Sequence, residues 1–153
     1  MLSQTAEHAI RALLFLAQRP EGEAVPAARI AAALGAPANY LAKTLNALAR
    51  RGLIASTRGP AGGFRLRRAA DRITLAEVDG AFGEVRAQAM CLLGDRPCSG
   101  RHPCRAHAHW EALCEQVRAP LRTTTIADLL RPNTLEIDAG ANAGIPGPAA
   151  RAA

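Results

Sequence analysis

The stretch that decides the fold runs from Pro26 to Arg67 and reads PAARIAAALGAPANYLAKTLNALARRGLIASTRGPAGGFRLR. Its first half contains two short segments with helical apolar periodicity, joined by the three-residue turn Gly35-Ala36-Pro37. A glycine just past one helix and a proline opening the next are typical of two consecutive helices. Such a pair is a helix-turn-helix candidate, although an ordinary helical hairpin has the same pattern.

The second half of the stretch favours DNA binding over an ordinary hairpin. The runs LIAST (53–57) and GFRLR (63–67) alternate with the period of two that half-buried strands require. The glycine-rich segment between them, which begins at Arg58, predicts a tight turn. A β-hairpin directly after a helix-turn-helix is a wing. Because GPAGG lies in a hairpin and not between a strand and a helix, it does not predict a nucleotide site.

The charge distribution points to the same partner. The chain has a net charge of +6 and a pI near 10.1, and residues 24–70 contain eight arginines or lysines and no acid. A one-sided positive field of this kind favours a polyanion, although a solvated basic face is the simpler alternative. With one Trp, one Tyr and three Phe, the chain lacks a stacking platform for single strands, so duplex DNA is expected.

The predicted second helix should enter the major groove with its N-terminal residues at the base edges. Its Asn39 can read adenine through the amide, and Lys43 can meet guanine or phosphate. The residues expected to contact DNA are Ala38, Asn39, Tyr40, Lys43, Thr44, Arg50, Arg58 and Arg65.

The flanking segments predict further helices. Residues 4–18 form an amphipathic helix, and Thr74 with Glu77 forms a capping box that opens a short one ending near Phe82. A longer helix should begin near Pro103 or Cys104 and be kinked or ended by Pro120. It carries an apolar stripe, which we interpret as a dimer contact: Ala106, Trp110, Leu113 and Val117. A last short helix starts with Thr125 and runs to Leu130.

Three of the four cysteines lie within fourteen residues, at Cys91, Cys98 and Cys104, among several histidines. Thiolates and imidazoles are soft and borderline metal ligands. Structural zinc sites usually contain a Cys-x2-Cys pair, which this loop lacks, and gaps of six and five residues suit something larger than one ion. A cluster-binding loop is the sharper hypothesis, with zinc or uncoordinated redox thiols as alternatives. Cys114 is most simply a small buried apolar residue.

At this point the order of motifs resembles a known family. The segment AIRAL from Ala9, the wing motif RGPAGGFRL from Arg58 and ITLAEV from Ile73 look like the Rrf-type winged-helix regulators. This family includes the IscR-like and NsrR-like iron–sulfur sensors, and the resemblance covers about residues 1–131. It implies a homodimeric transcription factor whose DNA affinity depends on a cluster held by three cysteines.

Position by position, the resemblance places the three cluster thiolates at Cys91, Cys98 and Cys104, and it singles out His107 as the fourth ligand. In NsrR-like members an acidic residue of the partner subunit completes the site, and Glu7 occupies that position here. A histidine ligand favours 2Fe–2S over 4Fe–4S, whereas an acidic one is compatible with either. Two departures are the first gap, six residues in place of five, and Ala42, where IscR has an acidic base reader.

The sequence therefore predicts a mostly helical protein: a winged helix-turn-helix domain (1–70), a cysteine loop with a dimerisation helix (71–131) and a flexible tail (132–153). We expect a cytoplasmic, homodimeric DNA-binding regulator, a repressor switched by an iron–sulfur cluster that responds to cluster status, nitric oxide or redox state. The alternatives are a cluster-free regulator that senses a metabolite and a zinc-stabilised DNA-binding module. No catalytic motif is present, so no enzyme is expected, and no apolar run is long enough to span a membrane.

Overall fold

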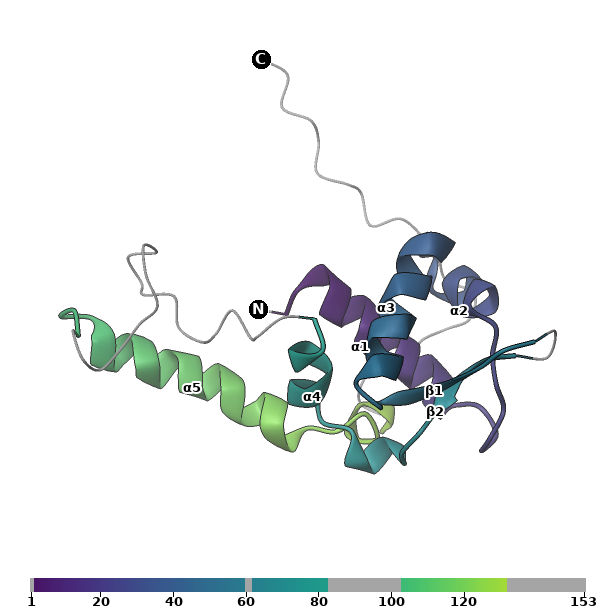
Figure 1. The fold of residues 1–153 in the computed structure, drawn as a ribbon. Coiled ribbons are helices and arrows are strands. Elements are labelled where there is room, and N and C mark those ends of the chain that lie inside the picture. Colours follow the sequence, from purple (N-terminus) through teal and green to yellow (C-terminus); the bar gives the residue numbers. More distant parts are fainter. Residues whose placement is uncertain (1, 60–61, 83–102, 132–153) are drawn as a thin grey trace, which may run out of the picture.

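The computed structural model describes residues 2–59, 62–82 and 103–131 (Figure 1). Its longer helices are α1 (Gln4–Ala17), α2 (Ala27–Leu34), α3 (Ala38–Arg50), α4 (Leu75–Gly80) and α5 (His107–Thr123). Strands β1 (Ile54–Thr57) and β2 (Gly63–Leu66) form an antiparallel hairpin, and short 3-10 helices cover η1 (Ala70–Arg72) and η2 (Asp128–Leu130). The prediction of a mostly helical chain with a two-stranded wing is confirmed. The predicted tail and most of the cysteine loop lie outside the described residues.

The turn between α2 and α3 forms as its residue types require. Gly35 ends α2 in the left-handed region at φ 61°, a conformation that costs glycine little. Its neighbour Ala36 donates its backbone N–H to Ala31 at 3.0 Å, which closes the end of α2. Pro37 directly precedes α3, and Pro26 precedes α2 in the same way, so both helices begin one residue later than expected.

The core is built around α1. The side chains of α1 that face inward include Ile10, Leu13, Leu14 and Leu16, all 8% exposed or less. They meet α3 through Leu41, Leu45 and Leu48 in one continuous apolar cluster. In Figure 1, α1 passes behind α3 and lies between the helix-turn-helix and α4. Because α1 packs against both α3 and α4, the helix-turn-helix and the segment that contains α4 share a single hydrophobic core.

The wing is tied to this core by one extra bridge. Val25, just before α2, exchanges two backbone hydrogen bonds with Phe64 of β2, at 2.9 and 2.8 Å. This approach is close enough that a Cβ on Gly63 would lie 2.4 Å from the backbone of Val25. Glycine is therefore required at this point of the GPAGG segment by packing and not by a positive φ.

Helix α5 has little contact with the core along most of its length. It projects away from the winged helix in Figure 1, and of its residues only Cys114 is buried. Its C-terminal end is joined to the core through Thr124, which accepts a hydrogen bond from the backbone of Leu75 at 3.0 Å. The helix begins three residues later than Cys104 and continues past Pro120 to Thr123, so Pro120 does not end it. No helix in the described part of the chain is long and apolar enough to cross a membrane.

Two reciprocal capping interactions form where α4 and η2 begin. The capping box predicted at Thr74 forms, because Glu77 accepts a hydrogen bond from the Thr74 backbone at 3.0 Å and donates its own N–H to the Thr74 hydroxyl. Thr125 and Asp128 make the equivalent pair before η2. The backbone hydrogen bond from Thr74 is the largest cause that lowers the pKa of Glu77, and the guanidinium of Arg68, 2.9 Å away, adds to it.

We predict that Gly63→Ala destabilises the protein by about 1–3 kcal/mol, because the new methyl group would overlap the backbone of Val25. Thermal unfolding measures the loss. The matched control is Gly80→Ala at the end of α4, where nothing lies within 4 Å of the added Cβ. A Gly63→Ala melting temperature no lower than that of the control would contradict the close approach.

The lowered pKa of Glu77 predicts acid sensitivity. Its folded-state pKa lies below the ordinary 4.5, so the unfolded chain binds the proton first and the stabilisation is lost as the pH falls through the folded-state pKa. Glu77→Gln keeps the capping geometry but removes the titration. We expect a flatter dependence of the free energy of unfolding on pH below about 5 in this variant than in Glu21→Gln, an exposed control. Burial of Asp79 raises its pKa and opposes this trend in all three proteins alike.

Candidate nucleic-acid interface and cysteine loop

Helix α3 presents one exposed polar face opposite the side that packs on α1. Asn39, Lys43, Asn46 and Arg50 follow one another at helical spacing and are all exposed. The predicted contacts Ala38, Asn39, Lys43 and Arg50 therefore lie on accessible surface. Asn46 was not among the predicted residues. Its position three residues after Lys43, on the face opposite the leucine stripe, is the signal that would have identified it.

Thr44 does not lie on this face. It is 3% exposed, and its hydroxyl donates a hydrogen bond to the backbone carbonyl of Tyr40 at 3.2 Å. Position 44 falls beside Leu41, Leu45 and Leu48, so it turns toward α1 together with them. This burial contradicts the prediction that Thr44 contacts DNA.

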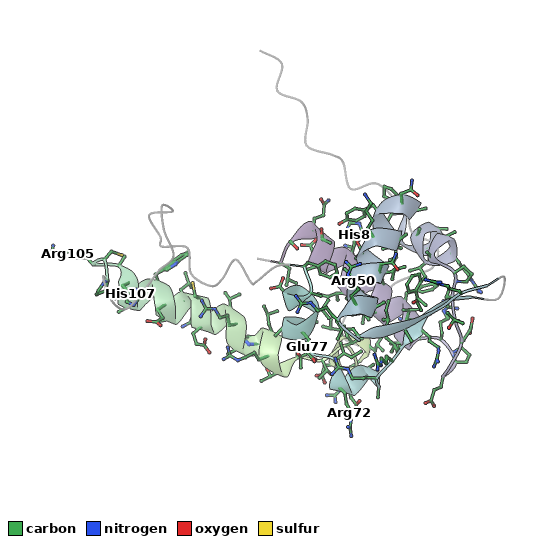
Figure 2. The ribbon with its side chains drawn as sticks, in the orientation of Figure 1. His8, Arg50, Arg72, Glu77, Arg105 and His107 are labelled. Carbon is green, nitrogen blue, oxygen red and sulfur yellow. The ribbon has the colours of Figure 1, made fainter. Side chains whose placement is uncertain are left out.

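Tyr40 is held by the first two turns of α1. Its hydroxyl donates to the Thr5 hydroxyl oxygen at 3.0 Å, across 35 positions of the sequence. Its ring and the imidazole of His8 form a T-shaped pair, with ring centres 5.4 Å apart and an interplanar angle of 83°. His8 is fixed in turn by a 2.8 Å hydrogen bond between Nδ1 and the Gln4 carbonyl, and Figure 2 shows it close to α3. Tyr40, one of the predicted DNA contacts, thus holds the first turn of α3 against α1.

Of the exposed arginines in the basic segment, Arg29 lies 3.9 Å from the Glu23 carboxylate. The others form no ion pair with a described residue: Arg50, Arg51, Arg58, Arg65 and Arg67. Arg58 follows β1 directly and starts the turn of the wing, whereas Arg65 lies within β2 opposite Ala55. A guanidinium without a carboxylate partner keeps all its donors for phosphate oxygens.

Of the predicted cluster ligands from the cysteine region, the structure describes Cys104 and His107, whereas Cys91 and Cys98 lie outside the described residues. Cys104 and His107 stand at the start of α5, and the backbone N–H of His107 donates to the Cys104 carbonyl at 3.0 Å. Nε2 of His107 lies 3.3 Å from the Glu111 carboxylate. The described residues contain no group of three or more metal-ligating side chains.

The two alternative fourth ligands lie on different helices of the chain, His107 on α5 and Glu7 on α1. His107 is at the far end of α5, next to Arg105, whereas His8 marks the first helix (Figure 2). Glu7, the residue before His8, is exposed on that helix. Its carboxylate and the His107 imidazole therefore belong to separate parts of the molecule.

Helix α5 also exposes apolar surface. Leu113 and Val117 are 52% and 45% exposed, and they are the large apolar side chains left uncovered in the described part of the chain. They lie one turn apart on the stripe predicted for a dimer contact, on which Trp110 is half-buried. Apolar side chains of this size in such a row are typical of an interaction surface.

A helix-turn-helix followed by a wing, with an exposed polar recognition face and unpaired arginines, defines a winged helix-turn-helix DNA-binding protein. The model of the Rrf2 family, described as iron-dependent transcriptional regulators, matches residues 2–132. The chain belongs to this family of transcriptional regulators.

Individual relatives agree with this assignment. The chain is 36% identical over 132 residues to an HTH-type transcriptional regulator of Aquifex aeolicus, covering 85% of this chain and 91% of that protein. It is 33% identical over 130 residues to the transcriptional regulator IscR of Xenorhabdus nematophila, covering 85% and 79%. Among solved structures, CymR, the global cysteine regulator of B. subtilis, superposes with a TM-score of 0.70 at 22% identity, covering 84% of this chain and 95% of that one. For IscR of T. potens the TM-score is 0.66 at 22% identity, with 85% of each chain covered.

The contact between Tyr40 and Thr5 predicts a specific pattern of stabilities. Tyr40→Phe removes the donor and Thr5→Val the acceptor, so each should lower the free energy of unfolding by about 1 kcal/mol and the double variant by no more than one of them. Thr57→Val, at an exposed position of β1, controls for the threonine change. Urea unfolding of the four variants measures this.

Measurements of DNA binding distinguish a positioning role of Tyr40 from a direct contact between Tyr40 and DNA. If Tyr40 acts by positioning α3, neither Tyr40→Phe nor Thr5→Val changes the slope of log affinity for duplex DNA against log salt concentration. A lower slope in Tyr40→Phe alone, with additive losses of stability, would mean that the hydroxyl meets a phosphate.

Proposed function

We propose that the chain is a homodimeric repressor that binds palindromic operator DNA and whose DNA affinity is switched by an iron–sulfur cluster. The observation that carries the proposal is the joint occurrence of an Rrf2-family winged helix and a loop of three cysteines that runs into the start of α5. The signal would be cluster supply, nitric oxide or redox state.

The residues present fit such a group. Cys104 and His107 supply a thiolate and an imidazole one helical turn apart, and both are ligand types that iron–sulfur clusters accept. We assign Cys91, Cys98 and Cys104 as the cysteine ligands and His107 as the fourth, with Glu7 of the partner subunit as the alternative. A cluster with three thiolates and one other ligand supplies a labile iron and a shifted potential. The histidine favours 2Fe–2S over 4Fe–4S.

The exposed apolar side chains of α5 support the proposal of a homodimer. Leu113 and Val117 offer the apolar row that a second copy of α5 would cover, and a two-fold axis would suit two half-sites in adjacent turns of the DNA. Such a pairing is also what would bring Glu7 of one protomer to the other protomer's loop. In the single chain the winged helix and the start of α5 lie apart (Figure 2).

A series of contacts within the chain connects α5, which follows the cysteine loop, to the predicted DNA-binding face of α3. Thr124, after α5, bonds to Leu75 at the start of α4, and α4 packs against α1. Helix α1 in turn holds the first turn of α3 through Thr5 and His8. A change in the position of α5 could therefore be transmitted to α3 through residues in contact, from α5 to α4 and from α4 to α1. Such a series of contacts can couple two sites.

On DNA, the proposed contacts are Asn39, Lys43, Asn46 and Arg50 in the major groove and Arg58 of the wing at the backbone or minor groove. Arg65 is retained as a backbone contact, with Ala38 at the helix start. Because Ala42 replaces an acidic base reader, we expect the operator to differ from that of IscR.

We expect anaerobically purified protein to be brown, with iron and acid-labile sulfide in matching amounts. Cys104→Ala should lose both the colour and the sulfide. Cys114→Ala should keep them, because that thiol is 7% exposed and lies within α5 outside the cysteine loop. Visible spectra and metal assays on the same samples give the result, and His107→Ala beside His109→Ala then tests the fourth ligand.

Three outcomes would redirect the proposal. Colourless protein without sulfide, even after anaerobic reconstitution, would favour a regulator that senses a metabolite. Stoichiometric zinc, with unfolding by chelators, would make the loop a structural metal site. Equal affinity of cluster-loaded and cluster-free protein for the operator would remove the switch while leaving the DNA-binding function in place.

A further inference from the structure

A cavity of about 500 Å³ opens between the turn that follows α1 and the segment that follows β2. Its volume lies within the range of small-molecule sites in proteins. The connection after α1 returns alongside β2 as far as Val25, which bridges Phe64, so the two walls are fixed to each other by backbone hydrogen bonds (Figure 1). The cavity therefore lies between two segments that backbone hydrogen bonds join.

Positive charge dominates the cavity wall. Four arginines line it, Arg19, Arg65, Arg67 and Arg68, against two glutamates, Glu21 and Glu23. Arg68 is engaged by Glu77 at 2.9 Å, and Glu23 lies 3.9 Å from Arg29, which is outside the cavity. This leaves Arg19, Arg65 and Arg67 facing a single unshared carboxylate, an arrangement of like charges that a bound anion would stabilise.

Arg19 is set in place before any ligand arrives. Its guanidinium lies over the ring of Phe15, 4.3 Å from the ring centre, and Phe15 is itself 7% exposed in the core. Its Nε is buried with no hydrogen-bond partner among the described residues. Arg67 is exposed, and its backbone N–H donates to the Leu53 carbonyl at 3.2 Å. A guanidinium held in place as that of Arg19 is loses little entropy on binding a planar or tetrahedral oxyanion.

Of the four arginines of the cavity, Arg65 is a predicted DNA contact, whereas Arg19, Arg67 and Arg68 are not. In the hairpin, Thr57 pairs with Gly63 beside the turn and Ile54 pairs with Leu66, so Arg67 and Arg68 follow the base of the wing. Arg58, which starts the turn, is at the opposite end of the hairpin. The tip of a wing approaches DNA, whereas the base of this wing lies at the other end of the hairpin, next to the C-terminal end of α3.

We propose that this cavity binds a small multivalent oxyanion, such as a phosphorylated or polycarboxylated metabolite, through Arg19 and Arg67, with Arg65, which is also a proposed DNA contact, adding a third positive charge to its wall. The proposal goes beyond the cluster-dependent function and does not rest on it. Neither α5 nor the described cysteines, Cys104 and Cys114, line the cavity, so we expect the site in cluster-free protein as well.

The probe is inorganic pyrophosphate, titrated into the full chain by isothermal calorimetry at constant ionic strength, with chloride as the reference anion. We expect saturable binding of one pyrophosphate per chain, weakened roughly tenfold by Arg67→Gln and by Arg19→Gln. Arg72→Gln, an exposed arginine of η1 that is outside the cavity (Figure 2), should change the affinity less than about twofold. Melting temperatures of the three variants check that each is folded.

Two results would overturn the proposal. If Arg72→Gln weakens pyrophosphate as much as Arg67→Gln, the anion is only screening the net charge. If saturating duplex DNA displaces pyrophosphate from the wild type, and Arg67→Gln weakens DNA binding as much as Arg50→Gln does, the cavity holds a phosphate of the DNA backbone. Loss of pyrophosphate binding in Arg67→Gln with unchanged DNA affinity would support a separate site for a free anion.

Discussion

The burial of α1 is the constraint on which the other elements depend. Eight of its fourteen residues are buried, and they face α2, α3, α4 and the wing strand β2 at once. A helix in this position cannot shift for one neighbour without disturbing the others, because protein interiors are close-packed. The first two turns of α1 add polar contacts to Tyr40, and its last turn supplies Phe15 beneath Arg19. One helix thus positions the recognition helix at one end and a cationic cavity at the other.

Much of this architecture can be predicted from sequence because it is encoded locally. Gly35 with Pro37, the capping box at Thr74 and the alternating runs around the GPAGG segment each specify a turn, a helix start or a hairpin through neighbouring residues. The family assignment likewise follows from short motifs in a fixed order.

What could not be predicted depends on which residues meet across the chain. Thr44 is among the predicted DNA contacts but is buried. A polar residue beside a stripe of leucines gives no sign of whether it turns in or out. The partners of Tyr40 are 35 and 32 positions away, and sequence spacing does not show such contacts. The excess of arginine predicted an anionic partner. Only the fold shows that it is divided between the recognition face, the tip of the wing and the cavity at its base.

The bridge between Val25 and Phe64 has a consequence for how such a protein could be regulated. Because Val25, just before α2, is hydrogen-bonded to Phe64 of the wing and α2 packs against α3, the helix-turn-helix and the hairpin are held together by backbone hydrogen bonds as well as by packing. This bridge opposes a change in the spacing between the helix-turn-helix and the wing. If two copies pair as proposed, a signal would act by changing the orientation of their DNA-binding domains relative to each other, and a single half-site would be bound equally well with or without the signal.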